Sequence, residues 1–97
     1  MRCDEVVSRL RQHEAELRRL GVERLFLFGS TMRGKARADS DVDLFFDYQK
    51  GKLGPFELMD IKEQASRILG RPADIVTRDS LHKVLRRRIE ASALQVF

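Results

Sequence analysis

The sequence has little of what builds disulfide or zinc frameworks, and it lacks any apolar run of membrane-spanning length. Its 97 residues include one cysteine, two prolines and no tryptophan. The lone Cys3 can form no internal disulfide and has no companion at metal-ligand spacing, which excludes a zinc framework and fits a reducing compartment. Because no signal peptide and no membrane span can be recognised, we expect a cytoplasmic protein that does not associate with membranes.

The composition that remains is that of a small globular domain with a highly charged surface. Hydrophobic residues make up 42% of the chain, charged residues make up 35%, and the formal net charge is +4. This length supports one hydrophobic core, so we expect a single domain spanning residues 1–97, with no room for a separate substrate domain. A positive charge this small is common for a solvated surface, and we do not expect nucleic acid to be the direct substrate.

The most informative stretch of the chain runs from Phe28 to Leu44. An apolar run stops at Gly29-Ser30, a basic segment with a glycine follows, and Asp41 and Asp43 then alternate with apolar residues. This order predicts a strand, a tight turn, a loop and a second strand. On a strand the two aspartates would share one face, about 6.5 to 7 Å apart along the chain. Both carboxylates could then converge on the same hard cations.

A third carboxylate lies on a later predicted strand, Ala73 to Thr77. Asp74 occupies a position on that strand where an apolar residue would pack better, and such a violation of the pattern indicates function. Together, Asp41, Asp43 and Asp74 meet the needs of metal-assisted phosphoryl or nucleotidyl transfer with two Mg²⁺ ions. Taken alone, an Asp-x-Asp pair could equally be two solvated residues on an edge strand.

The turn before the aspartates suits a phosphate ligand. Gly29 lets the backbone approach an anion closely, and free N–H groups after it can point at that anion. We therefore predict that Gly29 and Ser30 bind the terminal phosphates of a nucleoside triphosphate. Arg33, with Lys35, would balance the charge that develops on the pyrophosphate.

Helical periodicity is present in three parts of the chain. The first predicted helix is capped by Asp4 and ends at Gly21. The second is opened by Pro55, and the third is capped by Asp79 or Ser80.

Two features near the end of the chain leave alternatives open. The run Arg86-Arg87-Arg88 could contact phosphates or an acidic partner, or it could simply suit the dipole of the last helix. The apolar residues between Ala91 and Phe97 either fold back onto the core or meet another subunit.

The combined pattern resembles the minimal nucleotidyltransferases of the DNA polymerase beta superfamily. That family has an apolar strand, Gly-Ser, a spacer rich in Arg and Gly, an Asp-x-Asp between apolar residues, and a third aspartate on a later strand. The resemblance covers essentially the whole chain, with one departure at Met32, where the family often has a small residue and a larger one could reshape the phosphate turn. The matching segments here are Phe28-Gly29-Ser30, Arg33-Gly34, Asp39-Ser40-Asp41-Val42-Asp43-Leu44 and Asp74.

The resemblance implies an α/β (α+β) fold: a single nucleotidyltransferase-like domain with a mixed sheet, helices packed on its faces, and the site at one sheet edge. It implies Mg²⁺-dependent transfer of a nucleoside monophosphate, with ATP the favoured donor. Stand-alone domains of this size also resemble the antitoxin half of two-gene modules whose partner is a HEPN-type ribonuclease toxin. In such relatives AMP is transferred onto the partner, which would supply the acceptor hydroxyl here and form a hetero-oligomer with this chain.

Two other functions stay open at this point. The chain could be a non-catalytic antitoxin that neutralises its toxin by direct binding, with a residual site. It could also be a polymerase-like domain acting on nucleic acid, although a chain of this length offers no obvious template channel.

Overall fold

The core of the fold is a mixed, four-stranded sheet within the residues that the structure describes. The structure is a computed structural model that describes residues 3–29, 42–49, 51 and 53–97. The strand order is β3-β2-β1-β4; β2 pairs antiparallel with β1 and parallel with β3, and β4 pairs antiparallel with β1. The mixed sheet implied by the family resemblance is therefore confirmed. The strands are β1 (Val22–Phe28), β2 (Val42–Tyr48), β3 (Ala73–Thr77) and β4 (Leu94–Gln95).

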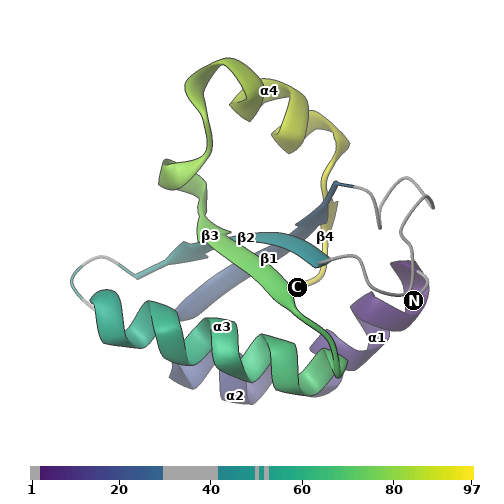
Figure 1. Cartoon of the computed structure of the whole chain (residues 1–97), viewed down its shortest axis with the longest axis vertical. Helices are drawn as coiled ribbons and strands as arrows, with labels where there is room; N and C mark the ends of the chain where they lie inside the picture. The colour runs from purple at the N-terminus through teal and green to yellow at the C-terminus, as the bar shows by residue number, and fades with distance from the viewer. Residues whose placement is uncertain (1–2, 30–41, 50, 52) are drawn as a thin grey trace.

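One face of this sheet is covered by helices α1 (Cys3–Gln12), α2 (Glu14–Arg19) and α3 (Pro55–Leu69). Figure 1 shows these helices on the same side of the strands, with α3 running along the length of the sheet. The covered face is apolar because every second residue of the strands points into one core, as the period of two in a strand requires. Fully buried members of this core include Leu10, Leu17, Leu25, Leu27, Leu44, Phe46, Ile61 and Leu69.

The first helical segment differs from the sequence prediction in two ways. It was expected to be one helix capped by Asp4, but α1 begins at Cys3, which places Asp4 in the first turn rather than at the cap. The segment is also broken at His13, whose φ of −110° and ψ of 19° leave the helical region. The break lets α1 pack against α3 and α2 pack against β1, so Leu10 and Leu17 are both fully buried.

Helix α3 was predicted with its start at Pro55, and that prediction is confirmed. Proline suits the first helical position because its missing N–H would have no partner there. The N–H of Gly54 donates a hydrogen bond of 3.0 Å to Glu57 Oε2, which ties the chain to the first turn. The helix ends at Gly70, whose φ of +68° is the left-handed conformation that glycine adopts without a steric penalty.

The last helix begins later than predicted. Neither Asp79 nor Ser80 caps it, because both belong to a short 3-10 turn, η1 (Arg78–Ser80), and α4 (Lys83–Ser92) begins after it. Its cap is His82, whose Nδ1 accepts a hydrogen bond of 3.3 Å from the backbone N–H of Val84. Figure 1 shows α4 on the other side of the sheet from α3, connected to the strands at both of its ends.

The apolar end of the chain folds back onto the core, which decides between the two alternatives that the sequence left open. β4 pairs with β1, and Val96 behind it is fully buried. The backbone N–H of Val96 donates to the carbonyl of Leu25 at 2.7 Å, and the N–H of Leu25 donates to the carbonyl of Phe97 at 3.2 Å. The end of the chain thereby forms one edge of the sheet.

Candidate active site

Two of the three predicted carboxylates lie side by side on the sheet face that α1, α2 and α3 do not cover. Asp43 on β2 and Asp74 on β3 are paired residues in the parallel register, so their side chains project from the same face. The neighbouring residues, Leu44 and Ile75, are paired as well and belong to the buried core of the other face. The alternation of apolar and acidic residues in both strands therefore places the two carboxylates together.

Gly29 stands directly against the Asp43 carboxylate. The residue before it, Phe28, is the antiparallel partner of Asp43, so the turn leaves β1 beside that aspartate. A Cβ built on Gly29 would lie 2.3 Å from Asp43 Oδ2, and the φ of Gly29 is +83°. A side chain at position 29 would thus face a steric clash and a strained backbone. Glycine at this position allows the turn and the carboxylate to meet.

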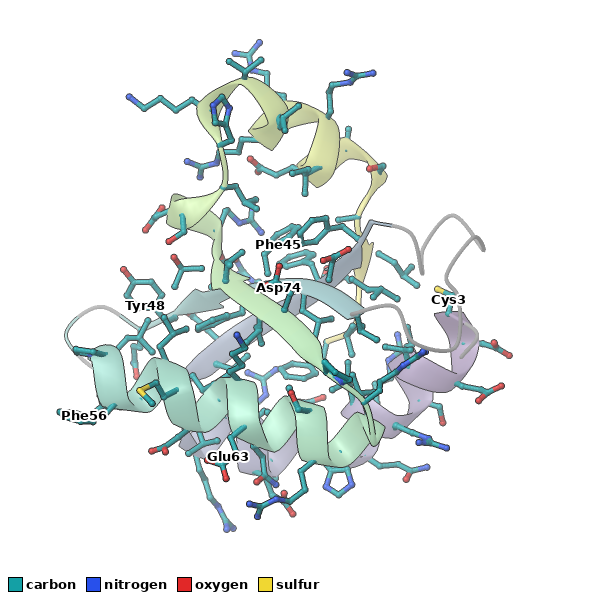
Figure 2. All side chains as sticks on the ribbon, in the orientation of Figure 1. Cys3, Phe45, Tyr48, Phe56, Glu63 and Asp74 are labelled. Carbon is teal, nitrogen blue, oxygen red and sulfur yellow. The ribbon has the colours of Figure 1, made fainter. Side chains whose placement is uncertain are left out.

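An aromatic cluster continues the same face behind the carboxylates. Phe45, two residues after Asp43, stacks on Phe26 with the ring centroids 4.7 Å apart, and it packs against Phe28 at 5.6 Å. Phe45 is 1% exposed. Figure 2 shows Phe45 in the space between the sheet and α4, and Asp74 on the nearby strand β3. The carboxylate pair is therefore bordered by an apolar wall on its own face.

Arg78 packs over two aromatic rings of this wall. Its guanidinium lies 4.7 Å from the ring centroid of Phe26 and 5.3 Å from that of Phe45. Nη2 donates a hydrogen bond of 3.1 Å to Asp47 Oδ2, whereas Nε lies 2.8 Å from Asp47 Oδ1 as an ion pair without hydrogen-bond alignment. Nη1 donates to Glu90 Oε2 at 3.0 Å. Arg78 thus connects β2 to α4.

None of the three residues in this network was predicted from the sequence to be functional. Asp47 continues the alternation of Asp43 and Phe45 along β2, and that spacing could have placed it on the same face. Arg78 belongs to η1 and Glu90 to α4. The sequence does not predict the geometry of the connection between these two elements. Their role in holding α4 could only be found from the folded chain.

Several predicted site residues belong to the part of the chain that the structure does not describe. Asp41, Ser30 and Arg33 lie outside the described residues, as do Met32 and Lys35. Segment 30–41 begins directly after Gly29 and ends directly before β2. The described residues nearest to this range include Phe28 and Asp43, which are paired in the sheet.

The carboxylate pair has the donor chemistry of a divalent-cation site. Carboxylate oxygens are the ligands that Mg²⁺ prefers, and Mg²⁺ completes its coordination with water and substrate phosphates. Over the part of the chain that the structure describes, no three His, Cys, Asp or Glu side chains form a group that could hold a metal ion. Asp43 and Asp74 supply carboxylate oxygens of the kind that such an ion takes, whereas Asp41, the predicted third ligand, lies outside the described residues.

Comparison with known proteins identifies the sequence family. The profile of the nucleotidyltransferase domain family matches residues 10–96. The chain is 37% identical over 79 residues to the protein adenylyltransferase MntA of Thermococcus cleftensis, covering 80% of this chain and 79% of that protein. It is 33% identical over 76 residues to a candidate protein adenylyltransferase of Methanocaldococcus jannaschii, covering 78% and 81% of the two chains.

Solved structures agree with this assignment. A candidate minimal nucleotidyltransferase superposes with a TM-score of 0.83 at 30% identity, over 97% of this chain and 95% of that one. A toxin-antitoxin complex with AMP-PNP contains a chain of the same fold, with a TM-score of 0.71 at 20% identity over 90% and 72% of the two chains. Since the family profile spans nearly the whole sequence and the fold agrees with it, the chain belongs to the nucleotidyltransferase domain family.

Proposed function

We propose that this chain is a Mg²⁺-dependent protein adenylyltransferase, which transfers AMP from ATP to a hydroxyl group of a partner protein. The observation that carries the proposal is the direct pairing of Asp43 with Asp74 beside Gly29 on one face of the sheet. A relative of 37% identity is named as a protein adenylyltransferase, which supports both the donor and the class of acceptor. Residues 1–97 would form one catalytic domain.

In this proposal Asp41, Asp43 and Asp74 hold two Mg²⁺ ions, and Gly29, Ser30 and Arg33 bind the nucleotide. Bound Mg²⁺ would neutralise phosphate charge and lower the pKa of the acceptor hydroxyl. The acceptor oxygen forms a bond to the α-phosphorus, the bond from that phosphorus to the bridging oxygen breaks, and pyrophosphate leaves. The hydroxyl proton is released to solvent.

The two described aspartates differ in accessibility, which suggests different tasks. Asp43 is half-buried on the inner strand β2 and touches the turn at Gly29, whereas Asp74 is exposed on the edge strand β3. We therefore assign to Asp43 the task of orienting the phosphates that we propose bind at the turn. Asp74 faces the side from which a large acceptor can approach.

The partner that best fits the proposal is a HEPN-type toxin, for which this chain would act as the antitoxin. Chains of the same fold occur in solved toxin-antitoxin complexes, including one named MntA-HepT. No helix in the described ranges has the length and apolar character to span a bilayer. We propose a cytoplasmic location, where ATP and such a partner are both available.

Intact-mass analysis of a co-expressed HEPN-type protein tests the chemistry. We expect the partner to gain the mass of AMP when wild-type chain, ATP and Mg²⁺ are present, and to gain nothing with Asp43→Ala. Asp60→Ala on the exposed side of α3 is a matched control that should leave the transfer unchanged. Undiminished transfer by Asp43→Ala would contradict the site assignment.

Neutralisation by contact alone is the competing function, and the exposed surface of α4 is the observation that favours it. That helix contains no buried residue, so it is available for binding without any chemistry. In this case Asp43→Ala would still protect cells from the toxin. Loss of protection by Asp43→Ala, with binding to the toxin intact, would rule this competitor out.

A further inference from the structure

Helix α4 carries apolar residues that the fold leaves in water. Val84 is 76% exposed and Leu85 is 46% exposed, and no residue between Lys83 and Ser92 is buried. A helix normally gains its stability by packing an apolar face against the core, whereas α4 contributes no fully buried residue. Packing within the core therefore does not explain why apolar residues occupy these positions of α4.

Four of the exposed residues of α4 form one helical stripe. Residues three, four and seven positions apart lie on the same side of a helix, and each of the four residues spaced in this way is exposed. We name this set the outer stripe of α4, and it consists of Val84, Arg87, Arg88 and Ala91.

The charge around the outer stripe is positive and unbalanced. The acidic residue of this helix, Glu90, accepts hydrogen bonds of 3.0 Å from Arg78 and 2.8 Å from Arg86. Among the described residues, Lys83, Arg87 and Arg88 form no ion pair. The stripe thus has the apolar Val84 and Ala91 at its ends and, between them, two arginines that have no acidic partner within the described chain.

Helix α4, which carries the outer stripe, lies over the sheet face that bears Asp43 and Asp74. Glu90 contacts Arg78, which lies over Phe26 and Phe45 on the face that carries Asp43 and Asp74. After α4 the chain enters β4, where Leu94 pairs with Leu27, one residue before Phe28. α4 therefore runs from the far end of the sheet back toward the end that bears the carboxylates, as Figure 1 shows.

We propose that the outer stripe of α4 is the docking surface for the acceptor protein. The proposal rests on the proposed function, because it assigns a surface to the protein that supplies the hydroxyl. The complementary surface would be an apolar patch bordered by Asp and Glu side chains, since it must cover Val84 and pair with Arg87 and Arg88. Docking on α4 would bring the acceptor to the face on which Asp74 is exposed.

Nucleic acid fits the same surface less well. A phosphate backbone would pair with Arg87 and Arg88, but it offers nothing apolar to cover Val84 or Leu85. Binding that depends on Val84 as well as on the arginines therefore distinguishes a protein partner from RNA.

The exposed side of α3 provides a matched control. Phe56 is 77% exposed, nearly the same as Val84 at 76%, and Met59 is 67% exposed. The charges around Phe56 are mixed, because Asp60, Lys62 and Glu63 share this surface. Figure 2 shows Phe56 on α3, away from the strand that carries Asp74. A partner that docks near the carboxylates would not need this side of the molecule.

The experiment compares Val84→Asp/Arg87→Glu/Arg88→Glu with the control Phe56→Asp/Lys62→Glu/Arg67→Glu. Both variants introduce the same number of charges at exposed positions, and circular dichroism verifies that both are folded. The probe is a purified HEPN-type protein from the same organism, with binding measured by calorimetry. We expect the α4 variant to bind at least about tenfold more weakly and the α3 control to bind like the wild type. Equal binding by wild type and α4 variant would overturn the proposal.

Two further measurements separate this inference from the proposed function and from RNA binding. Binding of an ATP analogue with Mg²⁺ should be unchanged in the α4 variant, whereas AMP transfer to the HEPN-type protein should fall with its affinity. If the wild type binds that protein through α4 but transfers no AMP, the proposed function fails and the docking surface stands. If transfer persists at the wild-type rate in the α4 variant, the docking surface fails instead. A short fluorescein-labelled RNA whose binding alone is lost in the α4 variant would also overturn the proposal.

Discussion

Asp43 and Asp74 are direct partners in the parallel pairing of β2 and β3. Like charges placed opposite each other on neighbouring strands destabilise a sheet by about 0.2 to 1 kcal/mol. Such a pair is retained where the two charges serve a common purpose, and a shared cation would remove the repulsion. We therefore expect the pairing of these two carboxylates to lower the stability of the fold while it serves the proposed function.

The first prediction follows from that opposition. Asp74→Asn is expected to raise the free energy of unfolding by up to about 1 kcal/mol, because it removes one of two facing charges. It should also lower AMP transfer by about a hundredfold or more, because a ligand to the reacting centre is lost. Urea unfolding and intact-mass kinetics measure the two effects.

In the wild type, Mg²⁺ with an ATP analogue should raise the melting temperature, and in Asp74→Asn it should not. A variant that is less stable and fully active would contradict the assignment.

The second prediction concerns the contact between Gly29 and Asp43. Gly29→Ala is expected to cost about 1 to 2 kcal/mol of stability, because alanine is strained at a φ of +83°. It should also abolish nucleotide binding, because the added methyl group would displace the Asp43 carboxylate. Gly51 is a close control, since its φ is +84° and nothing lies within 4 Å of the Cβ position. Gly51→Ala should show a similar loss of stability, measured by urea unfolding, with full nucleotide binding by calorimetry. Equal binding by both variants would show that the contact has no functional role.

The third prediction concerns the hold of Arg78 on α4. Its side chain is 26% exposed and is paired with Asp47 at 23% and Glu90 at 32%. Arg78→Ala is expected to destabilise the fold by about 1 to 3 kcal/mol, because the partly buried Asp47 loses its partner and Glu90 keeps only Arg86. The pair Arg67–Glu63 is 71% and 69% exposed, so Arg67→Ala should cost less than about 0.5 kcal/mol.

Hydrogen exchange locates the effect of Arg78→Ala within the fold. Amide protons of α4 should exchange faster in this variant, while those of α3 should keep their protection. Uniform acceleration over the whole sheet would instead mean that Arg78 stabilises the global fold rather than the position of α4.

The fourth prediction concerns how the reactivity of the Cys3 thiol depends on pH. Burial, and secondarily the negative charge of Asp4, raise the pKa of the Cys3 thiol above its ordinary value. At pH 8 to 9 the folded chain should therefore react with iodoacetamide more slowly than the urea-unfolded chain does. Because the unfolded thiol ionises first, the contribution of this group to stability is complete below the unfolded pKa of about 8.5 and is lost as the pH rises through the folded pKa. Asp4→Asn should lower the pKa of Cys3 in part. A faster reaction in the folded state would contradict the direction of the shift.

Much of the fold and part of the site could be predicted from the local pattern of residues. The alternation of apolar and acidic residues in β2 and β3 determines that Asp43 and Asp74 leave the buried face, because successive side chains on a strand point to opposite sides. Pro55 and Gly70 likewise determine where α3 begins and ends through their fixed backbone preferences. These features depend only on neighbours along the chain.

Other features were decided by contacts between distant parts of the chain. Three features depend on how separate elements pack. They are the parallel register that pairs Asp43 with Asp74, the burial of Val96 in the core, and the break in the helix at His13. Helix α4 begins only at Lys83 because η1 precedes it. Its position over the sheet depends on the hydrogen bonds of Arg78 with Asp47 and Glu90. Helical spacing in residues 81–89 resembles that of a core helix, yet a sequence pattern records only periodicity. Whether apolar residues at helical spacing become buried depends on how the rest of the fold packs, and here Val84 and Leu85 stay exposed.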